Sequence, residues 1–294
     1  KSTDGGLTWD KMENGLPKEK GKMAVAVAPS NPDKVYALVE SDTEKEQGGL
    51  FVSNDGGASF NRISKDHRLI SRAWYYIEIF VDPQNENVVH SLSAEWLKSI
   101  DGGSNWTPMQ SPHGDFHQMW FNPANPQNLI LADDGGAYVS FNGGGSWSPQ
   151  NNQPTAQLYR INADNNFPYR LYAGQQDNTS IVIDSRNLSG GSISERNWFY
   201  SAGGESAFLA FDPDHPKYVM GGSYQGTIEL LDQEIREGKG VMVVPLQYQS
   251  IMPKQMRYRF NWNAPIIWSK HEPGTFYHAG NRLFKTANLG KTWT

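Results

Sequence analysis

One turn motif recurs along this chain and constrains its fold more than any other feature. The clearest copy is Ser99–Trp106, which reads Ser-Ile-Asp-Gly-Gly-Ser-Asn-Trp. Asp101 can accept hydrogen bonds from N–H groups of its own turn, and the two glycines allow positive φ there. Trp106 then opens the returning strand with a large apolar surface for packing against a neighbouring unit. The motif therefore predicts a β-hairpin with a polar corner and an aromatic anchor.

Four further copies of the motif give its period. Two keep the aspartate and two carry asparagine in its place. The polar corners are Asp4, Asp55, Asp101, Asn142 and Asn288, and the anchors are Trp9, Phe60, Trp106, Trp147 and Trp293. Successive copies lie roughly 40–50 residues apart, except that the last interval holds about three such units. Short strands repeated at this period are typical of β-propellers.

A second repeated element has the same phase. An apolar strand runs into a proline-containing turn and then into another apolar strand, as in Phe80–Pro83 followed by Val88 and Val89. Proline presets a turn and cannot donate to a central ladder, so it belongs between strands. We therefore predict an all-β propeller, in one domain over residues 1–294, with six four-stranded blades. The predicted blades cover 22–63, 74–109, 116–148, 157–200, 207–246 and 261–286, the last completed by a strand from 9–13 or by sequence outside this chain.

Composition excludes several classes of function. A net charge of −5 gives no electrostatic case for binding nucleic acid or an anionic membrane. No apolar run is long enough to span a membrane, so we predict no membrane insertion. The chain has no cysteine, which excludes disulfides and cysteine-ligated metals, and the sequence implies no cofactor. Because Lys1 begins within a repeat, we expect a piece of a longer chain with further propeller or other domains beside it.

The candidate site lies in the loops that enter the first strand of each blade or join its second and third strands. In a propeller these loops gather at one face around the channel, where the rigid ring positions them. The loops of the third to sixth blades carry imidazole, carboxylate, amide, guanidinium and aromatic groups. Predicted ligand-binding residues are His113, His117, Asp133, Asp134, Gln175, Gln176, Tyr224, Arg259, Asn261 and Trp262, and the aromatic platforms are Trp74, Trp120, Tyr224 and Trp262.

Three carboxylates are candidates for acid and base catalysis: Asp115, Asp177 and Glu205. An inverting glycosidase needs two carboxyl groups roughly 6.5–9.5 Å apart with room for water. The alternative is that each acid bonds the backbone of its own turn, and for any single carboxylate we favour this structural explanation.

Metal binding is a further hypothesis for the same loops. His113, Asp115 and His117 alternate along the chain, and Asp133 or Asp134 could complete a ligand shell. No established ligand spacing is matched, so we predict a hydrogen-bonded network and no metal.

The turns resemble the Asp-box, or BNR repeat, of sialidases, Vps10 sortilins and certain glycoside hydrolases. Nearly the whole chain is similar to bacterial sortilin-like BNR-repeat proteins labelled glycosyl hydrolases, and less closely to two-propeller xyloglucanases. The stretches that carry this resemblance are 113–117, 133–136, 148–155, 167–170, 174–179 and 259–262.

The resemblance implies an exported bacterial propeller that is secreted, periplasmic or on the cell surface. Sortilins add a cysteine-rich region that this sequence lacks, and the arginine entrance motif of sialidases does not appear. Xyloglucanases place one catalytic aspartate in each of two propellers, and only one propeller is predicted here. We therefore predict a binding module that recognises a peptide or glycan at its loop face. The alternative is a glycoside hydrolase that uses Asp115 with Asp177 or Glu205.

Overall fold

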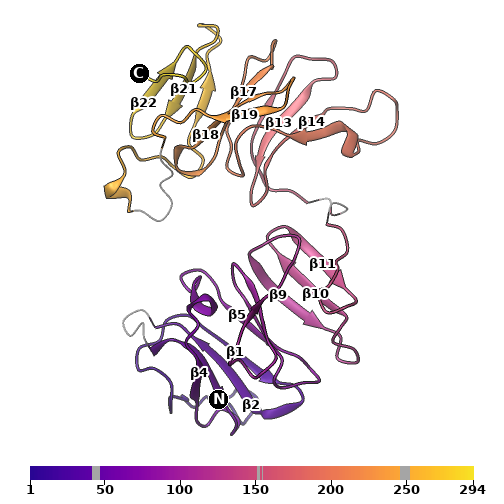
Figure 1. Cartoon of the computed structure of the whole chain (residues 1–294), viewed down its shortest axis with the longest axis vertical. Helices are drawn as coiled ribbons and strands as arrows, with labels where there is room; N and C mark the ends of the chain where they lie inside the picture. Colours follow the sequence, from indigo (N-terminus) through magenta and orange to yellow (C-terminus); the bar gives the residue numbers. More distant parts are fainter. Residues whose placement is uncertain (42–46, 151–152, 154, 246–251) are drawn as a thin grey trace. The chain divides into compact units, whose positions relative to one another are not determined.

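The computed structural model describes residues 1–41, 47–150, 153, 155–245 and 252–294. Within these residues there is no α-helix, and the strands form six antiparallel sheets, in each of which every strand pairs with the next one in sequence (Figure 1). Such up-and-down sheets are the blades of a β-propeller, so the predicted fold class is confirmed. No helix in the described residues is long and apolar enough to cross a membrane. The stretch 148–155 and the connection 247–259 lie partly outside the described residues.

The chain divides into two compact units, 1–154 and 155–294, each with three sheets. The prediction of one domain stays a prediction. In unit 1 the first sheet contains β1 (Met23–Ala28), β2 (Asn31–Val39), β3 (Gly49–Ser53) and β4 (Asn61–Ser64). The second contains β5 (Glu78–Val81), β6 (Val89–Leu92), β7 (Trp96–Ser99) and β8 (Thr107–Pro108). The third contains β9 (Phe116–Phe121), β10 (Leu129–Asp133) and β11 (Gly136–Ser140).

Unit 2 contains the fourth to sixth sheets. The fourth consists of β12 (Leu158–Ala163), β13 (Arg170–Gln175), β14 (Ser180–Asp184) and β15 (Trp198–Tyr200). The fifth consists of β16 (Leu209–Ala210), β17 (Tyr218–Gly222), β18 (Ile228–Asp232) and β19 (Glu237–Gly240). The sixth consists of β20 (Ile266–Trp268), β21 (Phe276–Ala279) and β22 (Leu283–Thr286).

Apolar side chains that alternate along the strands pack successive sheets against one another. In unit 1 one core joins Leu50 of the first sheet to Leu97 of the second, and another joins Trp96 of the second to Leu131 of the third. Unit 2 repeats the pattern, with one core between its fourth and fifth sheets and another between its fifth and sixth. Each unit is therefore a stack of blades.

The corner of each motif is built as predicted. In the copy at Asp101, the carboxylate accepts the Asn105 side-chain and backbone N–H groups at 2.6 and 2.9 Å. The Ser99 hydroxyl donates to the same carboxylate at 2.8 Å and accepts the N–H of Gly103 at 2.8 Å. Gly102 and Gly103 have φ of 72° and 94°. These hydrogen bonds, that from the Asn105 side chain above all, lower the pKa of Asp101 to about 2.

The other four corners repeat this arrangement. Hydrogen bonds from neighbouring side chains hold the pKa values of Asp4 and Asp55 well below the usual range of an aspartate. At Asn142 and Asn288 the side-chain oxygen accepts the backbone N–H four residues on, at 2.8 and 3.0 Å. Asparagine therefore preserves the turn without carrying a charge.

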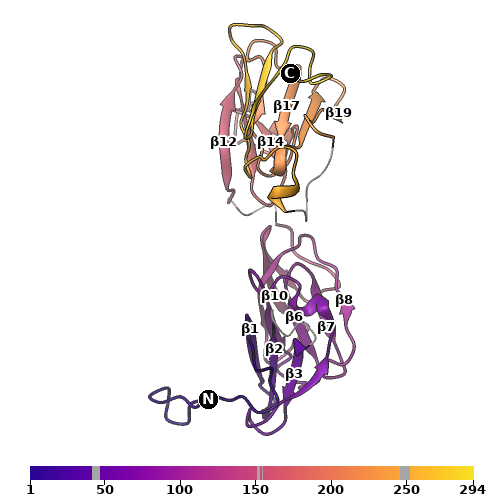
Figure 2. The ribbon, with the colours of Figure 1, turned by 90° about the vertical axis from the view of Figure 1, so that its left-hand side faces the viewer.

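Trp106, Trp147 and Trp293 pack as predicted, each in a core that joins two blades, whereas Phe60 packs against its own sheet and Leu16. The ring of Trp147 in the third blade lies 5.7 Å from Trp96 of the second at an interplanar angle of 68°. In the sixth blade, Trp293 donates its Nε1–H to the Val241 carbonyl beyond β19, at 2.8 Å. By contrast, Trp9 is 73% exposed, and the N-terminal segment extends away from the sheets of its unit (Figure 2).

Two predicted strands are missing from the described residues. The third and sixth sheets have three strands instead of four, and residues 9–13 belong to no sheet. At the edge of β11, the Gln153 side chain bonds both backbone groups of Ala137, at 3.2 and 2.7 Å, and the Ser148 N–H donates to the Val139 carbonyl at 2.9 Å. Side-chain and single-residue contacts thus occupy the positions where a fourth strand was predicted.

Candidate functional site

In unit 1, the loops that precede β5 and β9 meet the loop that joins β10 to β11. Asp115, held at a φ of 62°, forms an ion pair with Arg72. His117 places Nε2 at 2.7 Å from Asp134 Oδ1, and its ring stacks on Tyr76 with centroids 4.1 Å apart. The Asp134 N–H donates to the Asp115 carbonyl at 3.2 Å. The structure thus brings together three of the predicted residues, Asp115, His117 and Asp134.

An exposed aromatic surface borders this cluster. Trp74 and Tyr75 are 79% and 55% exposed, and their rings stack at 5.9 Å. The Arg72 guanidinium lies 5.6 and 5.8 Å from the two ring centroids, within cation–π range. We call Arg72, Trp74 and Tyr75 the Arg72 patch. The sequence indicated Trp74 as a platform but not Arg72, whose only signal was its place two residues before an aromatic run.

Two further predicted residues are tied into the turns of unit 1. Asp133 is 8% exposed, and its carboxylate accepts hydrogen bonds from the Gly135 N–H at 2.9 Å and from Tyr138 and Gln150 at 3.2 Å. Burial raises its pKa. The His113 Nδ1 lies 2.9 Å from the Gly114 carbonyl. Both residues therefore make contacts within their own turns, as expected if their role is structural.

The metal hypothesis has no matching geometry in the described part of the chain, where no group of three or more histidine, cysteine or acidic side chains is arranged to hold an ion. Asp115 faces a guanidinium and His117 faces a carboxylate, so both are engaged in pairs. The residues weighed as ligands therefore do not form a ligand set.

In unit 2, a polar network is centred on Gln176. Its Nε2 donates to Asp177 Oδ1 at 2.6 Å and to Glu205 Oε2 at 2.8 Å. The Asp177 N–H donates to the same Glu205 oxygen at 2.8 Å, which ties the two loops together. Tyr159 donates its hydroxyl to Gln176 Oε1 and accepts the Trp262 Nε1–H at 2.9 Å. Four predicted residues, Gln176, Asp177, Glu205 and Trp262, thus meet in one place.

This network limits what its two carboxylates can do. Both bonded oxygens lie within hydrogen-bond distance of one nitrogen, so they are closer together than the roughly 6.5–9.5 Å of an inverting pair. Asp115 belongs to unit 1, whereas Asp177 and Glu205 belong to unit 2. The Asp177–Glu205 spacing does not fit inversion, and a catalytic role for any of the three stays a prediction.

The remaining predicted residues of unit 2 lie around the network. The Tyr224 and Trp262 rings stack 5.0 Å apart at 16°, and the Ser206 hydroxyl donates to the Trp262 carbonyl at 2.9 Å. Gln175 closes the hairpin between β13 and β14, its N–H donating to the Thr179 carbonyl at 3.3 Å. Arg259 and Asn261 are exposed in the loop before β20.

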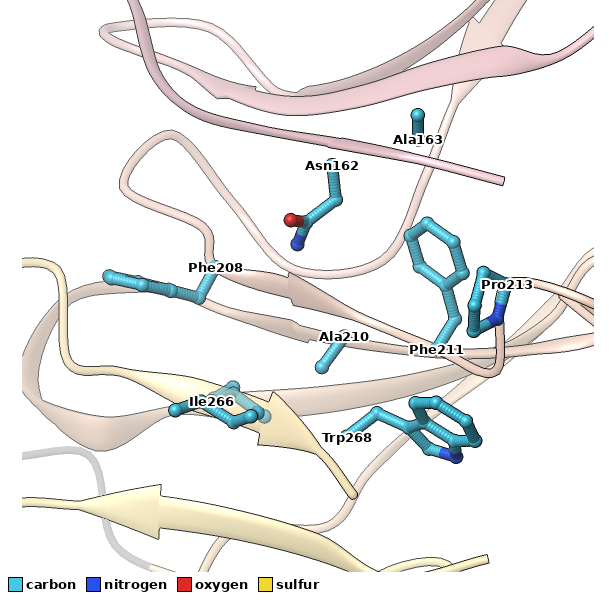
Figure 3. A pocket seen from close by; sticks show the side chains of 9 residues that line it. Asn162, Ala163, Phe208, Ala210, Phe211, Pro213, Ile266 and Trp268 are labelled. Carbon is cyan, nitrogen blue, oxygen red and sulfur yellow. The ribbon is translucent and has the colours of Figure 1, made fainter. Parts of the chain in front are cut away.

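The first strands of the three sheets of unit 2 border an apolar cavity of about 290 Å³ (Figure 3). Phe208, Phe211 and Ile266 are among the side chains that line it, and none of its lining residues is charged. Its one amide, Asn162, already donates to the Leu209 carbonyl at 2.5 Å. The cavity therefore provides an apolar space but no reactive group.

No family model matches the chain, and no curated protein matches it. Among solved structures, the GH74 enzyme of Niastella koreensis is 16% identical, with a TM-score of 0.37, over 93% of this chain and 46% of that one, so the chain spans about half its length. YCF48 from Cyanidioschyzon merolae is 14% identical, with a TM-score of 0.33, over 95% of this chain and 85% of that one. YCF48 bound to D1 peptide is 14% identical, with a TM-score of 0.36, over 96% and 84%. At these values the matches assign no family and no function.

Proposed function

We propose that this chain is a binding module that recognises a peptide segment of a partner protein at the loop ends of its blades. The observation that carries the proposal is the Arg72 patch, in which Trp74 is 79% exposed and rests beside Tyr75 and a guanidinium. Clustered exposed aromatics on a soluble protein mark interaction sites. Tryptophan, tyrosine and arginine are also the residue types that carry most of the energy of protein interfaces.

The patch is held in place before any partner arrives. Asp115 pairs with the Arg72 guanidinium, and the buried Tyr76 next to it donates its hydroxyl to the Ser93 carbonyl at 2.9 Å. Side chains that are already ordered lose less conformational entropy on binding. A peptide would therefore meet a preformed aromatic and cationic surface.

Peptide selection with a matched pair of variants tests this proposal. Peptides selected from a displayed random library on the unmodified chain are measured by calorimetry against Trp74→Ala and Trp9→Ala. Trp9 is 73% exposed like Trp74, but its indole N–H donates to the Gly6 carbonyl of its own turn at 3.1 Å. We expect Trp74→Ala to weaken binding about tenfold or more, and Trp9→Ala to leave it unchanged. Equal affinities for both variants, or binding confined to glycans on a parallel array, would contradict the peptide proposal.

A glycoside hydrolase is the second candidate, favoured by the two carboxylates joined at Gln176 beside the stacked Tyr224 and Trp262. A retaining mechanism places its carboxyl groups about 5–5.5 Å apart, which suits close neighbours better than inversion does. Hydrolysis of a polysaccharide panel that is lost in Glu205→Gln and kept in Trp74→Ala would favour this candidate over binding alone.

We also propose that the module works outside the cytoplasm, which rests only on the resemblance of the sequence to exported repeat proteins. Fractionation of cells that make the protein with its natural flanking sequence tests it. Recovery from the cytoplasmic fraction alone would contradict the proposal.

A further inference from the structure

Unit 2 contains a cavity of about 590 Å³ at the loop end of its fifth sheet. Gly203, Gly221, Tyr224, Ile228, Glu229 and Met242 contribute to its lining, and we call it the glycine cavity. Its volume lies within the range of small-ligand sites, roughly 300–1,000 Å³. It shares Tyr224 with the aromatic stack but none of the residues of the Gln176 network.

Glycine is required where the cavity wall is formed. A side chain on Gly203 would collide with the Gly222 carbonyl, and one on Gly221 would collide with the Ala202 carbonyl. Gly203 also has a φ of 79°, which other residues seldom adopt. The backbone after β15 therefore lies directly against β17, and the space beside it stays open.

Glu229 supplies the only charge among the residues that line the glycine cavity. Its Oε2 accepts the Gly203 N–H at 2.9 Å, which fixes the carboxylate at the wall. Among the described residues, no lysine, arginine or histidine forms an ion pair with it. A half-buried carboxylate without a cation favours a positively charged ligand.

The other walls suit a cation on an apolar stem. Tyr224 is held by its stack on Trp262, and an aromatic ring attracts a cation. Met242 and Pro245 give the cavity an apolar side. A cation with a short hydrocarbon chain would satisfy both kinds of wall.

We propose that the glycine cavity binds a primary ammonium on an unbranched alkyl stem, as in a lysine side chain of the peptide partner. Glu229 holds the ammonium, and Met242 contacts the stem. Because one Glu229 oxygen is already bonded to Gly203, the carboxylate suits a compact point charge better than the two-pronged fork of a guanidinium. A calcium or magnesium ion would need several oxygen ligands, and the cavity supplies one carboxylate. The idea that the ammonium belongs to a peptide rests on the proposed function, whereas the assignment of an ammonium ligand rests on the cavity alone.

Nuclear magnetic resonance titration of the 294-residue chain with N-acetyl-lysine N-methylamide tests the assignment. The backbone signals of Gly203, Gly221 and Gly240 report on the cavity. We expect saturable shifts with the lysine probe, and binding about tenfold or more weaker for the norleucine analogue, which has the stem without the charge. Glu229→Gln keeps an acceptor for the Gly203 N–H but removes the charge, and should weaken lysine binding about as much. Glu237→Gln, on the exposed strand β19 of the same sheet, is the matched control and should change nothing.

Several results would overturn the assignment: equal binding of norleucine, tighter binding of the arginine analogue, shifts that map outside the cavity, or the same loss in Glu237→Gln. If Glu229→Gln fails to fold, two other tests apply: lysine binding by Tyr224→Leu, and lysine binding by the unmodified chain in high salt. Both should weaken binding, and lysine affinity that changes in neither test would refute the proposal. Lysine binding here without any peptide selected by the Arg72 patch would retain the cavity assignment and refute the proposed partner class.

Discussion

The outer strands of the first three sheets and the strands of the fourth sheet are fastened by different means. In unit 1 each hairpin is closed at Asp55, Asp101 or Asn142 by hydrogen bonds that span four residues or fewer. The fourth sheet has no such motif, and the Arg170 Nε donates to Asp184 Oδ1 at 3.0 Å from the neighbouring strand. Phe199 on β15 lies under Arg170, with the guanidinium 5.6 Å from its ring.

The difference shows what a local fastening provides. A corner whose donors and acceptor belong to one turn forms wherever its short sequence occurs, so it can be repeated along a chain. A pair such as Arg170 and Asp184 needs two strands already in register. This pair joins β13 to β14, and the next connection, from β14 to β15, is a longer one that runs from 185 to 197.

The largest effect we expect is on the free energy of unfolding, and it should differ between a packed anchor and an exposed one. Trp147→Ala removes a ring that lies against Trp96 and Tyr138, and should cost about 3 kcal/mol of unfolding free energy. Trp9→Ala, at a 73% exposed ring of the same motif, should change it by less than about 0.5 kcal/mol. Urea denaturation measures both. Similar losses would show that the anchor acts within its own turn and not between blades.

The charge pair of the fourth sheet should matter less than a packed anchor. Arg170→Met leaves Asp184 without its arginine and should cost about 1–2 kcal/mol. Arg236→Met is the control, since Arg236 shares only the ring of Phe199, at 5.7 Å. The same denaturation assay applies. A loss in Arg236→Met as large as that in Arg170→Met would mean that stacking on Phe199, not the ion pair, holds the strands of this sheet together.

The smallest effect we expect is on the stability of the fold at low pH. The pKa of Asp101 is about 2 in the folded chain and about 3.9 in an unfolded one, so its carboxylate stabilises the fold fully above the unfolded value. That contribution is lost as the pH falls from about 4 to about 2. Asp101→Asn copies the corners at Asn142 and Asn288, and should lower the melting temperature slightly at pH 7 while flattening its decline in acid. An unchanged acid decline would show that this corner does not contribute to it.

The sequence predicts best what lies within a few residues. The corners, the anchors at Trp106, Trp147 and Trp293, and the order of strands follow from short patterns, and the structure agrees. The exposure of Trp9 was not predictable, because an anchor packs only if a neighbouring blade is present beside it.

The site was less predictable for the same reason. The loops of Gln176 and Glu205 were identified, but their bonds link residues far apart in sequence. Arg72 and Glu229 went unnoticed, since neither is part of a motif. Their proposed roles depend on an exposed ring in one case, and on a glycine in β17 and another in the backbone after β15 in the other.

Gln153 has a consequence for how the protein behaves in a crowded solution. Its primary amide offers Ala137 the same donor and acceptor that another chain's backbone would offer. Unpaired edge strands can pair with one another and cause aggregation, and proteins commonly protect these edges with charged residues or proline. Here Gln153 satisfies Ala137 and Ser148 satisfies Val139, so these backbone groups of the β11 edge are already bonded and cannot pair with another chain.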